Sequence, residues 1–239
     1  MSYVKPNDER ARYAILLLKI VMVLTITSLA SSLLQLNLLN NAANGIEIST
    51  ENAKINDMRE WIVGIVYLVA YIISIVTFIL WFRRAYYNLH QRVENLDQKD
   101  RMATISWFIP IVNLFGPYQI MKELYYRTQI LFDSNDINQH QNLGTRYVRL
   151  WWALWIITGI LGRVIAAQSR NATSITDLTN GTILDITQSI LGIPLALLAI
   201  KVVKDYAKVE PILASMKNDY SFRIATLDSN ILDNDLDPN

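Results

Sequence analysis

The chain has 239 residues, of which 52% are hydrophobic, and its mean hydropathy is +0.21. This value is high for a chain that also contains long polar segments, so the apolar residues must be concentrated in blocks. The formal net charge of +1 gives no general attraction to nucleic acid, and we expect no nucleic-acid partner. The absence of cysteine excludes disulfides, thiolate nucleophiles and cysteine metal ligands.

The N-terminal segment, residues 1–14, carries Lys5, Arg10 and Arg12 in front of a long apolar stretch. No convincing signal-peptidase site follows this stretch. The pattern therefore predicts a retained membrane anchor rather than a cleaved signal peptide.

Four apolar stretches are long enough to cross the hydrocarbon core as helices, which takes about 20 residues. They cover residues 15–39, 61–82, 150–167 and 183–203. Four stretches of this length predict an all-α integral membrane protein with a membrane domain at 15–205. We expect external loops at 40–60 and 168–182. The tail, 206–239, begins amphipathic, is interrupted at Pro211, and is expected to end acidic and partly disordered.

Aromatic side chains near the ends of these stretches are expected to lie at the headgroup level of the bilayer. The tryptophans that bracket the second stretch or open the third are Trp61, Trp81, Trp151, Trp152 and Trp155. Tyrosines in similar positions are Tyr86, Tyr87, Tyr125 and Tyr126.

A further apolar segment, residues 105–129, is interrupted by Pro110, Asn113, Gly116 and Pro117. If it does not cross the membrane, 17 lysines and arginines lie on the cytoplasmic side and three outside; if it crosses, the counts are nine and 11. The positive-inside rule thus predicts that both termini are cytoplasmic. The segment is then either re-entrant or interfacial on the cytoplasmic side, and Asn113 is available to bond backbone groups freed by the prolines.

Two short motifs, WFRRAYYNL at 81–89 and WFIPIVNLFGPYQIMKELY at 107–125, resemble the DUF4328 family of bacterial multi-pass membrane proteins. The likeness extends over about residues 60–205. It implies a helical protein of the bacterial cytoplasmic membrane, and it implies no activity. The positions that match the family motif are Trp81, Arg84, Asn88, Leu89, Trp107, Pro110, Asn113, Pro117 and Glu123.

No catalytic or metal-binding motif is recognisable. His90 and His140 lack the spacing of a zinc site. We therefore predict a protein that is not an enzyme and uses no metal or other cofactor. The tripeptides that begin at Asn171 and Asn180 match the glycosylation pattern, which is common by chance and gives no information here.

Charged residues in or beside the spans have two interpretations. Arg83 and Arg84 either anchor a helix end or bind a lipid phosphate or a partner. Lys19 is expected to extend its charge to the interface. Arg163 and Asp185 enter neighbouring spans at similar depth, which predicts an ion pair near the outer leaflet.

Small residues in the last two spans are expected to let these helices pack closely. They are Gly159, Gly162, Gly192, Ala166, Ala196 and Ala199.

These features predict a non-enzymatic channel, carrier or membrane-complex subunit, with a membrane-protein partner or as a homo-oligomer. The alternative is a regulatory or interaction module that binds a protein or anionic lipid through its cytoplasmic arginine, tyrosine and asparagine side chains.

Overall fold

The structure, a computed structural model, describes residues 4–135, 137 and 143–216. Every regular element among these residues is helical, which confirms the predicted all-α fold. In chain order the elements are α1 (Asp8–Ala43), α2 (Thr50–His90), α3 (Met102–Ile105), the 3-10 helix η1 (Val112–Leu114), α4 (Gly116–Asp133), α5 (Arg146–Asn171) and α6 (Ile175–Ser215). The acidic end predicted for the tail, and His140, lie outside the described residues.

The helices α1, α2, α5 and α6 are long and apolar enough to cross a membrane, as predicted. In their most apolar windows only 17–22% of the residues are buried inside the protein. The outward side chains include Val66, Val69 and Ile72 of α2. Helices of soluble proteins turn polar side chains outward, so these apolar faces indicate a lipid bilayer environment.

The connections between the long helices are much shorter than predicted. Residues 44–49 separate α1 from α2, and residues 172–174 separate α5 from α6. The prediction of loops at 40–60 and 168–182 is therefore wrong for most of these residues, which are helical. The polar residues placed in those loops continue the helices beyond the apolar stretches.

Side-chain caps explain where the returning helices begin. The Ser49 hydroxyl accepts a hydrogen bond from the Asn52 N–H (3.1 Å). At α6 the Asp177 N–H donates to Ser174 Oγ, and the Ser174 N–H donates back to Asp177 Oδ2, both at 3.1 Å. This reciprocal capping box satisfies donors that a helix start otherwise leaves open. Hydropathy alone cannot place a helix end that polar caps define.

The chain divides into two compact units. Unit 1 consists of residues 1–14, 76–149 and 201–239, and unit 2 consists of 15–75 and 150–200. Unit 2 thus holds most of each predicted span. Unit 1 gathers the N-terminal segment, the long central connection and the start of the tail, which are the parts predicted to be cytoplasmic.

Unit 1 has an aromatic core formed by α2, α4 and α6. The Trp81 ring lies 6.3 Å from the Tyr206 ring, and the Tyr206 ring lies 5.8 Å from the Tyr125 ring. Trp81 and Tyr86 are fully buried, and Tyr125 is 1% exposed. The prediction that Trp81, Tyr86 and Tyr125 mark the lipid interface is wrong, because all three side chains are buried inside unit 1.

The end of α6 corrects a further prediction. Pro211 does not interrupt the helix, which continues to Ser215. A proline inside a helix removes one hydrogen bond and strains the preceding turn. Here Val209 and Leu213 are both buried in unit 1, and we infer that their burial offsets this cost.

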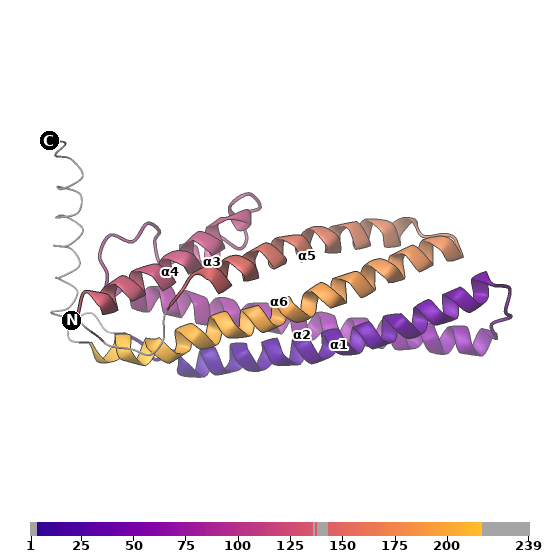
Figure 1. Ribbon diagram of the computed structural model, residues 1–239, viewed down its shortest axis with the longest axis horizontal. Coiled ribbons are helices and arrows are strands. Elements are labelled where there is room, and N and C mark those ends of the chain that lie inside the picture. Colours follow the sequence, from indigo (N-terminus) through magenta and orange to yellow (C-terminus); the bar gives the residue numbers. More distant parts are fainter. Residues whose placement is uncertain (1–3, 136, 138–142, 217–239) are drawn as a thin grey trace. The chain divides into compact units, whose positions relative to one another are not determined.

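The segment 105–129 is broken, as predicted, rather than one straight helix (Figure 1). Phe115 lies between η1 and α4, and its φ of −141° is not helical, so the chain changes direction there. A Cβ on Gly116 would lie 2.8 Å from Val112 Cγ1 and 3.0 Å from Ser106 Cβ, so only glycine fits there. Pro117 lies in the first turn of α4, where a missing N–H costs nothing. The re-entrant or interfacial position of the segment stays a prediction.

Unit 2 consists of two helical hairpins, one from α1 and α2 and one from α5 and α6 (Figure 1). A Cβ on Gly192 of α6 would lie 3.1 Å from Thr25 Cγ2, so this glycine lets α6 approach α1 rather than α5. A Cβ on Gly162 would lie 3.9 Å from Gln188 Nε2, whereas one on Gly159 would meet nothing within 4 Å. The small residues therefore allow close packing of α6 against α1 as well as against α5, the only pair that we predicted.

Candidate functional site

The first family motif lies at the end of α2 in unit 1. Trp81 and Asn88 are fully buried there, whereas Arg84 is half-buried. The Asn88 side chain accepts a hydrogen bond from the Lys5 N–H and donates to the Lys5 carbonyl, both at 2.9 Å. It also donates to Glu210 Oε1 at 2.7 Å. Asn88 thus joins the N-terminal segment, α2 and α6.

Glu210 and Asn7 complete this cluster, and sequence reasoning missed both. Asn7 Nδ2 donates to both carboxylate oxygens of Glu210 at 3.0 Å and to the Trp81 carbonyl at 3.2 Å. Glu210 is 6% exposed. The sequence did offer a signal for Glu210, because it lies in a stretch with several valines and alanines beyond the last span. A carboxylate buried in such a stretch needs hydrogen-bond partners.

Burial raises the pKa of Glu210 to about 7 from its ordinary value of 4.5. The hydrogen bonds from Asn88 and Asn7 and the nearby Arg84 charge lower this pKa, and the Asp8 charge raises it. The loss of solvation is the larger effect. Glu210 therefore changes its charge near neutral pH.

The second motif shapes the broken segment and the helix after it. The Trp107 ring packs edge-on against Phe78 and Phe82, with centroid distances of 5.8 and 6.4 Å. Asn113 does not use its side-chain oxygen as predicted, because Oδ1 accepts no hydrogen bond among the described residues. The backbone groups of this turn bond to one another instead, as in the bond from the Leu114 N–H to the Ile111 carbonyl.

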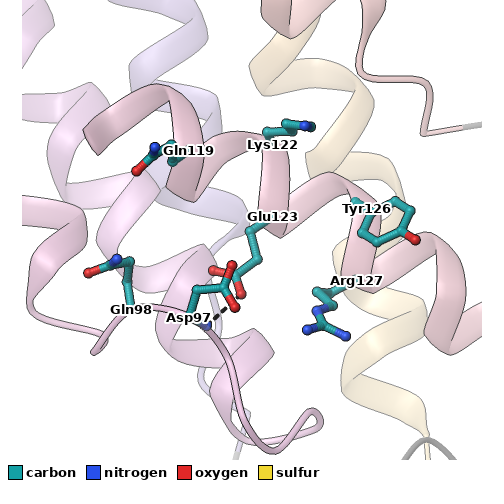
Figure 2. Close-up of a pocket in the computed structure, with 7 residues that line it drawn as sticks. All are labelled: Asp97, Gln98, Gln119, Lys122, Glu123, Tyr126 and Arg127. Carbon is teal, nitrogen blue, oxygen red and sulfur yellow. Dashed lines mark hydrogen bonds between the residues drawn. The ribbon is translucent and has the colours of Figure 1, made fainter. Parts of the chain in front are cut away.

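Glu123, the acidic residue of the second motif, fastens α4 to α2 and to the connection before α3. Its Oε2 accepts a hydrogen bond from the Tyr86 hydroxyl (2.5 Å), and its Oε1 accepts one from the Asp97 N–H (2.7 Å). Figure 2 shows the Asp97 and Glu123 side chains close together, with Lys122, Tyr126 and Arg127 projecting from α4. These residues border a cavity of about 520 Å³, whose lining carries both signs of charge.

A second cavity, which we call the basic hollow, lies in unit 1 and has a volume of about 700 Å³. It is lined by Arg83, Tyr87, His90, Gln91, Lys99, Asp100 and Arg101. Three of these side chains are lysine or arginine and one is acidic, so the lining is net positive. The ammonium of Lys5 lies 4.9 Å from the centre of the Tyr87 ring. The hollow therefore has cationic groups from α2 and from the connection, and the N-terminal segment places a further cation against one ring of its lining.

The model of the DUF4328 family, described as a domain of unknown function, matches residues 44–208. The chain belongs to the DUF4328 family. Comparisons with curated proteins and with solved structures find no match. The DUF4328 match includes Asn88 and Glu123 but neither Lys5, Asn7 nor Glu210. The buried cluster thus joins the family region to both flanking segments.

Within this DUF4328 chain, most motif residues build unit 1 rather than line a cavity. Trp81 and Trp107 pack in the aromatic core, and Pro110 and Pro117 shape the broken segment. Glu123 borders the cavity in Figure 2, but both of its oxygens already accept hydrogen bonds from the protein. In contrast, polar residues that lie between or just after the matched positions of the first motif line the basic hollow, namely Arg83, Tyr87, His90 and Gln91.

The charged pair predicted in the spans is not brought together. Arg163 is exposed, and the described residues show no ion pair between it and half-buried Asp185. Asp185 instead lies near enough to Glu60 of α2 for the two charges to interact. The prediction used depth alone, and depth does not show which face of a helix carries each residue.

Proposed function

We propose that this DUF4328 protein is a non-enzymatic membrane module whose basic hollow binds phosphate-bearing headgroups of anionic lipids. The observation that carries the proposal is the convergence of Arg83, Lys99 and Arg101 on one cavity. Arginine and lysine bind phosphate oxygens through charge-assisted hydrogen bonds. The volume of about 700 Å³ lies in the range typical of small-ligand sites.

The chain that follows the hollow supports a lipid rather than a soluble ligand. Directly after Arg101 the chain enters the broken segment, in which Phe108 is 72% exposed and Ile111 is 74% exposed. Leu114 and Phe115 are also exposed. Basic residues beside exposed apolar side chains are typical of surfaces that lie in the headgroup region of a bilayer. We therefore favour the interfacial position for this segment.

The predicted topology supports the same ligand class. The 17-to-three charge distribution predicts that the end of α2 and the connection after it are cytoplasmic. The cytoplasmic leaflet carries the anionic lipids, and each nearby lysine or arginine contributes about 1 kcal/mol to the attraction. The hollow would then face lipids whose charge complements its own.

A lipid-binding measurement with matched charge variants tests the proposal. The purified protein, solubilised in a neutral detergent, is titrated with short-chain phosphatidylcholine or with short-chain phosphatidylglycerol. Replacement of Arg83, Lys99 and Arg101 by glutamine is expected to weaken binding of phosphatidylglycerol about a hundredfold. The control replaces Lys122, Lys204 and Lys208, three exposed unit 1 lysines outside the hollow, by glutamine.

The control variant has the same net charge as the test variant, so equal losses in both would reduce the effect to general electrostatics and contradict the proposal. Inorganic phosphate added as a competitor separates the two sources of phosphate. Competition at millimolar concentration would mean that the hollow takes a free anion rather than a lipid headgroup.

A transport role is the second candidate, and one observation in unit 2 favours it. Polar side chains bond across three helices there: Gln35 Nε2 donates to Thr182 Oγ1 (2.8 Å), and Arg59 Nε donates to Ser31 Oγ (2.9 Å). Glu60 Oε1 accepts from the Ser31 hydroxyl at 2.6 Å. Polar groups between membrane helices are typical of solute and ion pathways. Solute flux into proteoliposomes, compared with empty liposomes, tests this role.

A further inference from the structure

The N-terminal segment is fastened to unit 1 before α1 begins at Asp8. Both backbone groups of Lys5 bond to the Asn88 side chain, and Asn7 bonds to Glu210 and to the Trp81 carbonyl. Asn7 and Asn88 are buried, whereas Lys5 and Pro6 are exposed. The segment is thus anchored by its backbone and by one buried amide, and it leaves the Lys5 side chain at the surface.

The anchoring determines where the Lys5 charge lies. The Lys5 ammonium lies over the ring of Tyr87. Tyr87 directly precedes Asn88 in the sequence and lines the basic hollow. The bonds at Asn88 hold the Lys5 backbone beside α2, and the cation–π contact holds its ammonium against Tyr87, a residue of the hollow's lining. Because the lysine side chain is long and flexible, its ammonium stays near Tyr87 only if the Lys5 backbone is held in place.

We propose that residues 4–7 form a strap that adds Lys5 to the basic hollow, with Asn88 and Glu210 as the positioning residues that hold it. This inference rests on the proposed function and deepens it. Asn88 binds the backbone of residue 5, which any residue provides, so the lysine side chain is what the strap contributes. Glu210 accepts hydrogen bonds from both amides that hold the strap, and it therefore links the end of α6 to the hollow.

The first measurement reports the position of the strap and needs no ligand. The chain has no cysteine, so a spin label on Pro6→Cys gives a single signal. The label should be restrained in the otherwise unchanged protein and become mobile when Asn88→Asp is added, because aspartate cannot donate to the Lys5 carbonyl and repels Glu210. Lys5→Gln should leave the label restrained, since it keeps the backbone bonds.

The second measurement reports binding of short-chain phosphatidylglycerol to the detergent-solubilised protein. Lys5→Gln is expected to weaken binding about fivefold, as one basic residue near an anionic surface contributes. Asn88→Asp, or removal of residues 1–6 if that variant does not fold, should weaken binding at least as much. Arg12→Gln is the matched control, because Arg12 is exposed, carries the same charge and lies outside the strap.

The outcomes separate this inference from the proposed function. Equal binding by Lys5→Gln and the unchanged protein, while the triple variant of the hollow binds weakly, would overturn the strap and leave lipid binding intact. A label on Pro6→Cys that is mobile in the unchanged protein would also overturn it. No preference of the unchanged protein for phosphatidylglycerol over phosphatidylcholine would overturn both.

Discussion

Asn88 at the end of α2 donates a 2.7 Å hydrogen bond to Glu210 of α6, across 122 residues of sequence. Both residues lie in unit 1 and both are buried. The same amide bonds to the backbone of Lys5. One asparagine side chain therefore connects three parts of the chain that are far apart in the sequence.

The role of Asn88 predicts a large loss of stability on substitution. Asn88→Leu leaves the Glu210 carboxyl and the Lys5 backbone without these partners in a buried place, and we expect the free energy of unfolding to fall by about 2–5 kcal/mol. Thermal unfolding in detergent, followed by circular dichroism, measures the change. Gln119→Leu, at an exposed position of α4, should have little effect. Equal losses in the two variants would contradict a special role for Asn88.

The raised pKa of Glu210, about 7 against an ordinary 4.5, predicts a pH dependence of stability. Between these two values the folded protein keeps a proton on Glu210 that the unfolded chain has lost, so the contribution of this group to stability is highest below about pH 4.5 and falls until about pH 7. The total loss from this group is about 3 kcal/mol. The charged groups that act on the Glu210 pKa are Arg84 of α2, which lowers it, and Asp8 at the start of α1, which raises it.

Unfolding by denaturant at a series of pH values checks this dependence. Glu210→Gln should flatten the fall between pH 4.5 and 7, because glutamine does not titrate. The exposed Glu94 provides the control, and Glu94→Gln should keep the slope. If Glu210→Gln keeps the full slope, the titration belongs to another group.

The bend of the broken segment predicts that Gly116 tolerates no side chain. A Cβ there would lie 2.8 Å from Val112 Cγ1, so Gly116→Ala must displace the turn, and we expect a loss of about 1–3 kcal/mol. Thermal unfolding of the same preparation measures it. Gly159→Ala is the matched control, because its Cβ would meet nothing within 4 Å, and alanine favours the helix by up to about 1 kcal/mol. A Gly116→Ala variant as stable as this control would show that the turn adapts.

The charge distribution predicts the topology, with both termini and the 122–149 connection inside. Single cysteines at Lys122 and Ser215 should stay unlabelled by a membrane-impermeant maleimide added to intact cells. A cysteine at Asn44, in the turn between α1 and α2, should be labelled. Permeabilised cells give the maximal labelling at each position. Labelling at Lys122 in intact cells would mean that the segment 105–129 crosses the membrane.

The four membrane-crossing helices and the all-α class could be predicted from the sequence. Burying a backbone in hydrocarbon demands continuous helical hydrogen bonding, and about 20 apolar residues in a row are enough to show it. The break around Gly116 and Pro117 was also predictable, since these residues limit the backbone locally. Family membership followed from the short motifs at 81–89 and 107–125.

The tertiary structure alone decided what the polar and aromatic residues do. Trp81 and Tyr125 are residue types typical of the membrane interface, yet both are buried, because each packs against Tyr206 of α6. Glu210 became a partner of Asn88 only through folding, and Arg163 did not meet Asp185. Hydrophobic periodicity reports how each helix meets its solvent, whereas these contacts depend on which helix faces pack together, and that choice is made by the whole chain at once.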